Sequence, residues 1–145
     1  MYENPCTRAT ALLRGEAPAP DLRGEAQFHQ RPDGVLVTVQ VTGLPADTPF
    51  FALHIHEGRD CAGRGFPNTG GHFDGRGRPH PDHQGDLPSL LNCNGKAYLA
   101  VMTDRFTLPE IMGRTLVIHS GPEDFRSQPG GSAGAKMGCG VIQCG

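Results

Sequence analysis

Hydrophobic and polar residues alternate most regularly between residues 35 and 41, where valine occupies every second position from Val35 to Val41. A period of two places successive side chains on opposite faces of an extended chain, so this segment predicts a β-strand with one buried face. Weaker patterns of the same kind predict strands at residues 10–13, 25–29, 50–56, 97–103, 115–119 and 140–144. We therefore expect seven or eight short strands.

Glycine and proline mark the connections between these segments. The RPDG sequence from Arg31 to Gly34 predicts a hairpin turn between paired strands, because proline presets one backbone dihedral and glycine accepts a positive φ. Two longer stretches, residues 57–94 and 120–137, show no convincing periodicity. Loops of this length in a compact domain are usually functional or disordered. Four potential metal ligands lie in the first stretch, so we expect bound metal to order it.

Length and composition narrow the fold class. A chain of 145 residues is long enough for one hydrophobic core and too short for two ordinary domains, so we expect a single domain over residues 1–145. The 21 glycines and 13 prolines interrupt the chain at intervals too short for long helices. This composition favours an all-β protein.

Charge and hydropathy exclude several kinds of partner. The formal net charge is −2, and the lysines and arginines are scattered, so no nucleic-acid partner is expected. No run of about 18 apolar residues predicts a membrane span, and residues 1–5 lack the pattern of a signal peptide. We expect a cytoplasmic protein if the chain is complete as given, and a periplasmic or extracellular one if a signal peptide has been removed.

Histidines are concentrated in and beside the first aperiodic stretch. Six of the seven are candidates: His54, His56, His72, His80 and His83 lie there or in the strand before it, and His119 ends the predicted strand at 115–119. His54 and His56 stand two residues apart in a predicted strand, so both rings project from one face. His119 ends the 115–119 strand and would complete a three-nitrogen site if that strand lies nearby. Each of these histidines taken alone has a plainer interpretation as a structural polar residue.

A second set of potential ligands follows His72. It consists of His72, His80, His83 and Asp86. Three nitrogens and one carboxylate match a closed tetrahedral zinc site. A zinc hydrolase would need an open coordination position and a general base, so this set does not favour one.

Five cysteines, an odd number, allow at most two disulfides within the chain. No two of them form a CxxC pair, which excludes a zinc ribbon.

The motifs together resemble those of the copper/zinc superoxide dismutases, and the resemblance runs from Ala11 to Ile142. They are HxH at residues 54–56, GGHF at 70–73, HxxHxGDL at 80–87, GRTLVIH at 113–119 and GCGVI at 138–142. Short spacing between His80 and His83 and a short second loop are typical of bacterial forms. The resemblance implies a Greek-key, eight-stranded β-sandwich or flattened barrel with two long functional loops.

The resemblance also implies the chemistry. Copper would be bound by His54, His56, His72 and His119, and zinc by His72, His80, His83 and Asp86. His72 would bridge the two metals as an imidazolate. The substrate would be the superoxide anion, converted to oxygen and hydrogen peroxide at the copper. A homodimer is one assembly open to such a fold, although the sequence does not fix the oligomeric state.

Further residues take their expected roles from the same resemblance. A disulfide would join Cys61 to Cys139 and stabilise the fold by roughly 4 kcal/mol. Apart from the resemblance, Cys6 and Cys144 lie near opposite ends of the chain and could bond if the first and last strands are neighbours, which would leave Cys93 free.

Lys136 occupies the position of the arginine that guides the anion, keeping the charge but losing the planar fork of donors. His72, as proton donor, and Lys136 are the catalytic candidates. A carboxylate that orients ligating histidines aligns with Glu123, and a shift of one residue would favour Asp124.

A function of a different class fits part of the pattern. The chain could be a copper/zinc-binding module that sequesters or delivers copper, or uses zinc structurally, with little dismutase activity. Lys136 supports this alternative. The complete set of six histidines and Asp86 argues against it, because a degenerate site would be expected to lack ligands.

Overall fold

The computed structural model describes residues 6–145, and nearly all its regular structure is β-strand. Residues 1–5, in which no signal-peptide pattern is expected, lie outside the described residues. The strands are β1 (Arg8–Gly15), β2 (Arg23–Arg31), β3 (Gly34–Thr42), β4 (Phe50–Phe51), β5 (Leu53–His56), β6 (Leu90–Leu91), β7 (Ala97–Thr103), β8 (Thr115–His119) and β9 (Lys136–Cys144). Two short helices, η1 (Pro67–Thr69) and α1 (Leu108–Ile111), complete the described elements. The predicted all-β class is confirmed.

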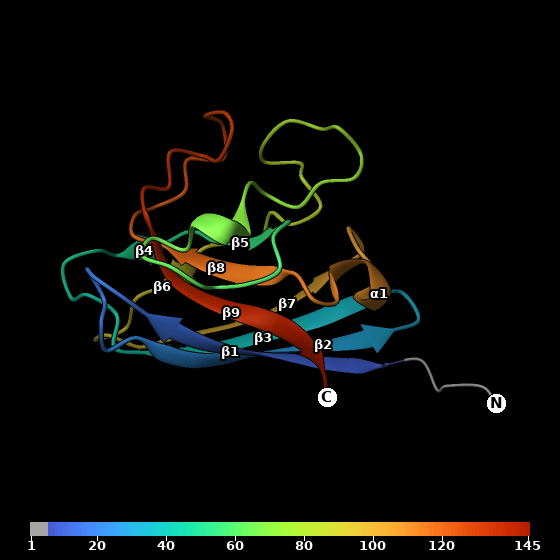
Figure 1. Ribbon diagram of the computed structural model, residues 1–145, viewed down its shortest axis with the longest axis horizontal. Helices are drawn as coiled ribbons and strands as arrows, with labels where there is room; N and C mark the ends of the chain where they lie inside the picture. The colour runs from blue at the N-terminus through green and yellow to red at the C-terminus, as the bar shows by residue number, and fades with distance from the viewer. Residues whose placement is uncertain (1–5) are drawn as a thin grey trace.

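Seven strands form one sheet in the order β5-β8-β9-β1-β2-β3-β7, and every neighbouring pair in it is antiparallel. Its edges are β5 and β7. The remaining pair, β4 and β6, connects these edges, because β4 runs into β5 and β6 leads into β7. The sheet therefore curls around the core as the expected Greek-key flattened barrel (Figure 1).

The predicted strand at residues 50–56 is divided into β4 and β5 at Ala52. The backbone N–H of Ala52 donates to the carbonyl of Gly121, and its carbonyl accepts from His119, so this residue bonds to the second loop and the end of β8. With β6, this division turns the seven segments predicted from the pattern into nine strands within residues 6–145, where the resemblance implies eight.

The hydrophobic core lies between the two layers of the curled sheet. The four alternating valines of β3 are each at most 2% exposed, which confirms the buried face predicted from their period. Phe28 of β2 and Leu53 and Ile55 of β5 are fully buried in the same core cluster. Full burial of such side chains contributes about 1.5–3 kcal/mol each. The β2–β3 hairpin forms at the predicted turn, with Arg31 paired to Gly34.

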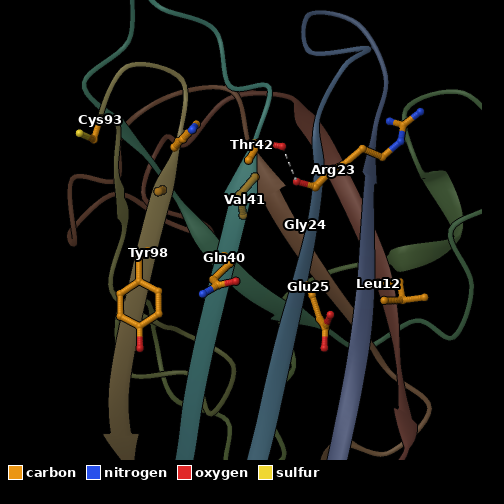
Figure 2. Close-up of a pocket in the computed structure, with 11 residues that line it drawn as sticks. Leu12, Arg23, Gly24, Glu25, Gln40, Val41, Thr42, Cys93 and Tyr98 are labelled. Carbon is orange, nitrogen blue, oxygen red and sulfur yellow. Dashed lines mark hydrogen bonds between the residues drawn. The ribbon is translucent and has the colours of Figure 1, made fainter.

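The outward faces of four strands carry a row of paired residues. Leu12 of β1 faces Glu25 of β2, Glu25 faces Gln40 of β3, and Gln40 faces Tyr98 of β7. These residues line a shallow hollow of about 600 Å³ (Figure 2). None of the clustered histidines lines this hollow.

The two long loops rise on the side of β5 and β8 (Figure 1). They cover the outer faces of these strands, so every residue of β5 and β8 is buried. A second, smaller apolar cluster lies under the first loop and consists of Cys61, Phe66, Val117 and Cys139. Because one face of β8 contacts the core and the other contacts the loops, the strand is apolar on both faces, which explains its continuous apolar run.

Two disulfides tie the chain together. Cys61 in the first loop bonds to Cys139 in β9, and Cys6 bonds to Cys144 across the neighbouring β1 and β9. Cys93 is a free, exposed thiol. In the described part of the chain, no helix has the length and apolar character needed to cross a membrane.

Candidate metal centre

Strand geometry places three histidines on one side of the β5–β8 pair. In β5, Leu53 and Ile55 enter the core, so His54 and His56 project toward the loops. His119 ends β8, where the pairing with β9 shifts register between Ile118 and His119. The two Nε2 atoms of His56 and His119 are 3.1 Å apart.

The first loop adds the fourth histidine by pairing with the edge of β5 that does not face β8. Isolated β-bridges join His56 to His72 and His54 to Asp86. One potential ligand atom from each of His54, His56, His72 and His119 lies within 4.8 Å of the others. The structure thus brings together the four histidines expected to bind copper.

The four residues expected to bind zinc also meet. Asp86 is central, with Oδ1 2.8 Å from His72 Nδ1 and Oδ2 3.0 Å from His80 Nδ1. His83 Nδ1 lies 3.2 Å from Asp86 Oδ2 and 3.3 Å from His72 Nδ1. The tightest group on this side is His54, His72, His80 and Asp86, so His83 lies at its margin. Both His54 and His72 belong to the two groups of neighbouring ligand atoms, and His72 is the ring that the resemblance expects to bridge the metals.

Hydrogen bonds select which nitrogen of each ring is free. The Nδ1–H of His56 donates to the carbonyl of Gly70 at 2.9 Å, and the Nδ1–H of His119 donates to that of Gly134 at 3.1 Å. Their Nε2 atoms therefore carry lone pairs and face each other. A cation between these atoms would accept both lone pairs.

Glu123 fixes two further rings. Its side chain is 1% exposed, and its carboxylate oxygens accept from His54 Nε2 at 2.7 Å and from His80 Nε2 at 2.6 Å. Asp124 instead accepts hydrogen bonds from the backbone of Arg126 and Ser127. Glu123, as aligned by the resemblance, is thus the carboxylate that orients ligand candidates. Gly131 permits this contact, because a side chain there would collide with Glu123.

Two buried nitrogens have no partner. Among residues 6–145, His54 Nδ1 and His80 Nδ1 are the buried side-chain nitrogens or oxygens without a hydrogen bond, although Asp86 lies near the second. Buried polar atoms normally have a partner. One orphaned nitrogen belongs to each ligand group, and imidazole nitrogen binds both copper and zinc. The residues therefore fit two metal ions, one on each side of His72.

Burial also keeps the rings in the form that binds metal. Desolvation lowers the pKa of His54 far below 6.5, and lowers the pKa of His56 to about 3 and of His119 to about 4. These imidazoles are neutral at pH 7, with lone pairs available. Burial alone would raise the pKa of Asp86, but its hydrogen bond from His72 and the nearby histidines lower it on balance, so it is a carboxylate.

A cavity of about 340 Å³ opens onto the first group. His56, His72 and His119 line one side, and Gly70, Gly71 and residues 128–134 of the second loop, other than Gly131, line the rest. Lys136 lies beside it, paired with His119 across β8 and β9. Its ammonium donates to Thr69 Oγ1 at 2.7 Å and to the carbonyl of Gly70 at 2.9 Å.

Sequence reasoning missed Thr69 and the backbone carbonyls of Gly70 and Gly134. Gly70 is part of the GGHF motif, but a carbonyl has no residue-type signal. A threonine preceding two glycines carries no functional signal of its own. These roles depend on loop geometry, which the sequence pattern does not show.

The chain is similar in sequence to a known protein family and to individual members of it. The sequence profile of the family described as Copper/zinc superoxide dismutase (SODC) matches residues 22–142. Superoxide dismutase (Cu-Zn) 2 of Aquifex aeolicus is 35% identical over an alignment of 135 residues, and the match covers 83% of this chain and 78% of that protein. Superoxide dismutase (Cu-Zn) of Legionella pneumophila is 32% identical over 142 residues, covering 92% of this chain and 86% of that protein.

A solved structure supports the fold independently. The crystal structure of a double mutant of a SOD-like protein from Bacillus subtilis superimposes with a TM-score of 0.79 at 24% identity. The match covers 92% of this chain and 96% of that chain.

Proposed function

Because this chain belongs to the copper/zinc superoxide dismutase family, we propose that it is an enzyme that converts superoxide to oxygen and hydrogen peroxide. The observation that carries the proposal is the pair of adjacent ligand groups that meet at His54 and His72, together with the buried Nδ1 atoms of His54 and His80, which form no hydrogen bond. A single structural ion would not need two groups of this kind.

The hydrogen bonds support a division of ligands. Copper would be held by His54, His56, His72 and His119, and zinc by His72, His80, His83 and Asp86. When bound, copper supplies the one-electron redox chemistry that protein side chains lack. Glu123 would hold one ligand of each metal in a single tautomer, since it accepts from His54 and His80.

In this proposal His72 holds the proton that the reduced product needs. Its Nδ1 faces Asp86 and His83, and its Nε2 lies toward Gly130 at the cavity wall. A proton held on Nε2 is therefore next to the space where a small oxygen species fits. The absent side chain of Gly130 leaves this nitrogen accessible.

Lys136 supports attraction of the anionic substrate. Its ammonium donates to the carbonyl of Gly70, a residue that lines the cavity, and a cation in a cleft raises the encounter rate of anions. A lysine orients a bound anion less strictly than an arginine, because it lacks the planar fork.

The test is a superoxide-removal assay on protein loaded with copper and zinc, with both metals counted per chain. We expect turnover with one copper and one zinc bound, and its loss in His119→Ala with zinc retained. Full occupancy without turnover in the unaltered chain would contradict the enzyme proposal and favour a metal-binding module.

We also infer that the protein works in an oxidising compartment. Both disulfides join segments far apart in the sequence, with separations of 138 and 78 residues. Such bonds persist outside the cytosol, and the bacterial periplasm is one such location. Alkylation of free thiols in cells before lysis tests this: only Cys93 should react, and labelling of all five cysteines would contradict it.

A further inference from the structure

We propose that Thr69 is a positioning residue for Lys136, holding its ammonium in place to guide the anion. This inference rests on the proposed function, in which Lys136 meets the substrate. Thr69 itself lies outside both ligand groups. Its importance comes from a chain of hydrogen bonds that starts at Lys136 and ends in the loop closed by the Cys61–Cys139 disulfide.

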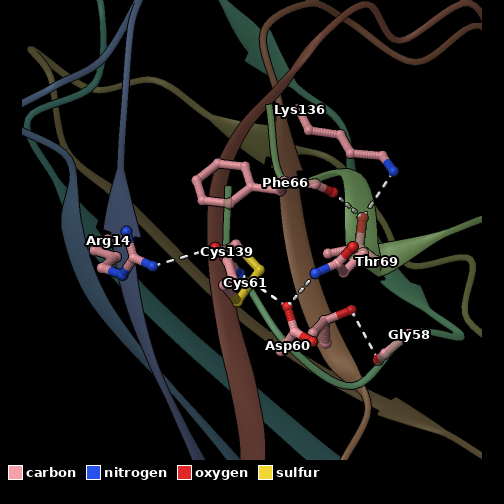
Figure 3. Close-up of a disulfide and its surroundings, with 11 residues drawn as sticks. Arg14, Gly58, Asp60, Cys61, Phe66, Thr69, Lys136 and Cys139 are labelled. Carbon is pink, nitrogen blue, oxygen red and sulfur yellow. Dashed lines mark hydrogen bonds between the residues drawn. A yellow bond between two sulfur atoms is a disulfide. The ribbon is translucent and has the colours of Figure 1, made fainter. Parts of the chain in front are cut away.

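This series of hydrogen bonds has two steps (Figure 3). Lys136 Nζ donates to Thr69 Oγ1 at 2.7 Å, and the Thr69 hydroxyl donates to the carbonyl of Phe66 at 2.8 Å. Thr69 is 0% exposed and is the last residue of η1. A buried hydroxyl with two partners at these distances is fixed in rotamer and in proton position.

The number of protons on each group decides which group donates and which accepts in these hydrogen bonds. The Thr69 hydroxyl has one proton, which it donates to Phe66, so toward Lys136 it can only accept. The ammonium has three N–H groups, and within residues 6–145 its hydrogen-bond acceptors are Thr69 Oγ1 and the Gly70 carbonyl. One N–H remains for an incoming anion.

The same contacts place the ammonium next to the copper ligands. The Gly70 carbonyl that accepts from Lys136 also accepts from His56 Nδ1. A lysine side chain is long and flexible, so a single acceptor would leave its charge free to rotate away. Thr69 supplies the second acceptor. It thereby compensates for the rigid fork that an arginine would have at this position.

The end of this hydrogen-bond series at Phe66 is held rigidly. Phe66 is fully buried, adopts a left-handed backbone with φ of 51°, and packs with Cys61, Val117 and Cys139. Arg14 adds a further tie, donating to the Cys61 carbonyl at 3.2 Å. The carbonyl that orients the Thr69 hydroxyl therefore cannot shift easily.

The test compares Thr69→Val, which keeps the shape and removes the hydroxyl, with Thr69→Ser, which keeps the hydroxyl. Azide serves as the probe anion, titrated spectroscopically into copper- and zinc-loaded protein. We expect Thr69→Val to weaken azide binding by about fivefold, since a hydrogen bond to a charged group is lost, and Thr69→Ser to bind as the unaltered chain does. In a Lys136→Met background, Thr69→Val should have no further effect.

A second readout needs no copper and no turnover. In zinc-loaded protein with ¹⁵N-labelled lysine, the Lys136 ammonium should give a signal protected from exchange with water. Thr69→Val should lose this signal and Thr69→Ser should keep it. Absence of the signal in the unaltered chain would overturn the inference even if Thr69→Val does not fold.

The outcomes separate this inference from the proposed function. An active enzyme in which Thr69→Val binds azide as tightly as Thr69→Ser would overturn the role of Thr69 alone. A protein without dismutase activity that still shows the protected ammonium and the azide difference would uphold the role of Thr69 and contradict the proposed function.

Discussion

Glu123 illustrates how one residue organises two metal sites. Its two oxygens accept from His54 and His80, which belong to different ligand groups. The sequence offered two adjacent carboxylates, and alignment with the family indicated the first. Asp124 is excluded by the turn that follows, because its oxygens accept from residues 126 and 127. Residue type alone did not distinguish them.

Replacing Glu123 by glutamine should weaken both sites. Glutamine has one acceptor oxygen and one donor nitrogen, so it cannot accept from both rings and one ring loses its tautomer control. We expect the affinity for zinc and copper to fall about 10- to 100-fold, measured by competitive metal titration. Asp124→Asn is the matched control and should leave both affinities unchanged; equal losses in the two variants would contradict this role of Glu123.

Lys136 is the other residue whose type should affect the rate of superoxide removal. Substitution Lys136→Arg should raise the rate of superoxide removal and strengthen its inhibition by added salt, because the guanidinium offers a fork of donors to the anion. Lys136→Met should lower the rate and flatten the salt dependence, as the guiding charge is lost. An unchanged rate in both variants, measured as a function of ionic strength, would show that Lys136 does not guide the anion.

At the scale of elements, the strands with a clear period were predicted well. The 97–103 and 115–119 strands have the predicted bounds, and the β3 valines occupy the predicted buried face. The sequence missed β6 and α1, because two residues and a single turn are too short to show a period. The capping box of Thr107 and Glu110 was the available signal for α1.

The two disulfides should differ in their effect on the loops. Each closes a long segment, so removing either should cost about 4–5 kcal/mol of unfolding free energy, measured with guanidinium chloride. Only Cys61→Ser/Cys139→Ser should also loosen residues 57–71 and slow turnover, because this bond lies in the apolar cluster with Phe66. Cys6→Ser/Cys144→Ser is the control, and amide exchange that is equal in the two variants would contradict this distinction.

At the scale of the whole molecule, the barrel and the loops have separate tasks. The curled sheet supplies His54, His56 and His119 on rigid strands, and the first loop adds His72, His80, His83 and Asp86. Sequence motifs indicated all seven residues, since their types and spacing are distinctive. Apart from Glu123, which the alignment with the family indicated, the contacts that orient them come from backbone carbonyls, which no pattern in the sequence specifies.

The shared histidine is the centre of this account, because it makes one site out of two groups of ligands. Diffraction from crystals of copper- and zinc-loaded protein, recorded at the absorption edges of both metals, tests it most directly. We expect two ions of different identity on opposite nitrogens of His72, each at about 2.0–2.1 Å, the usual distance from zinc to histidine nitrogen. A single ion, or two ions without His72 between them, would contradict the account.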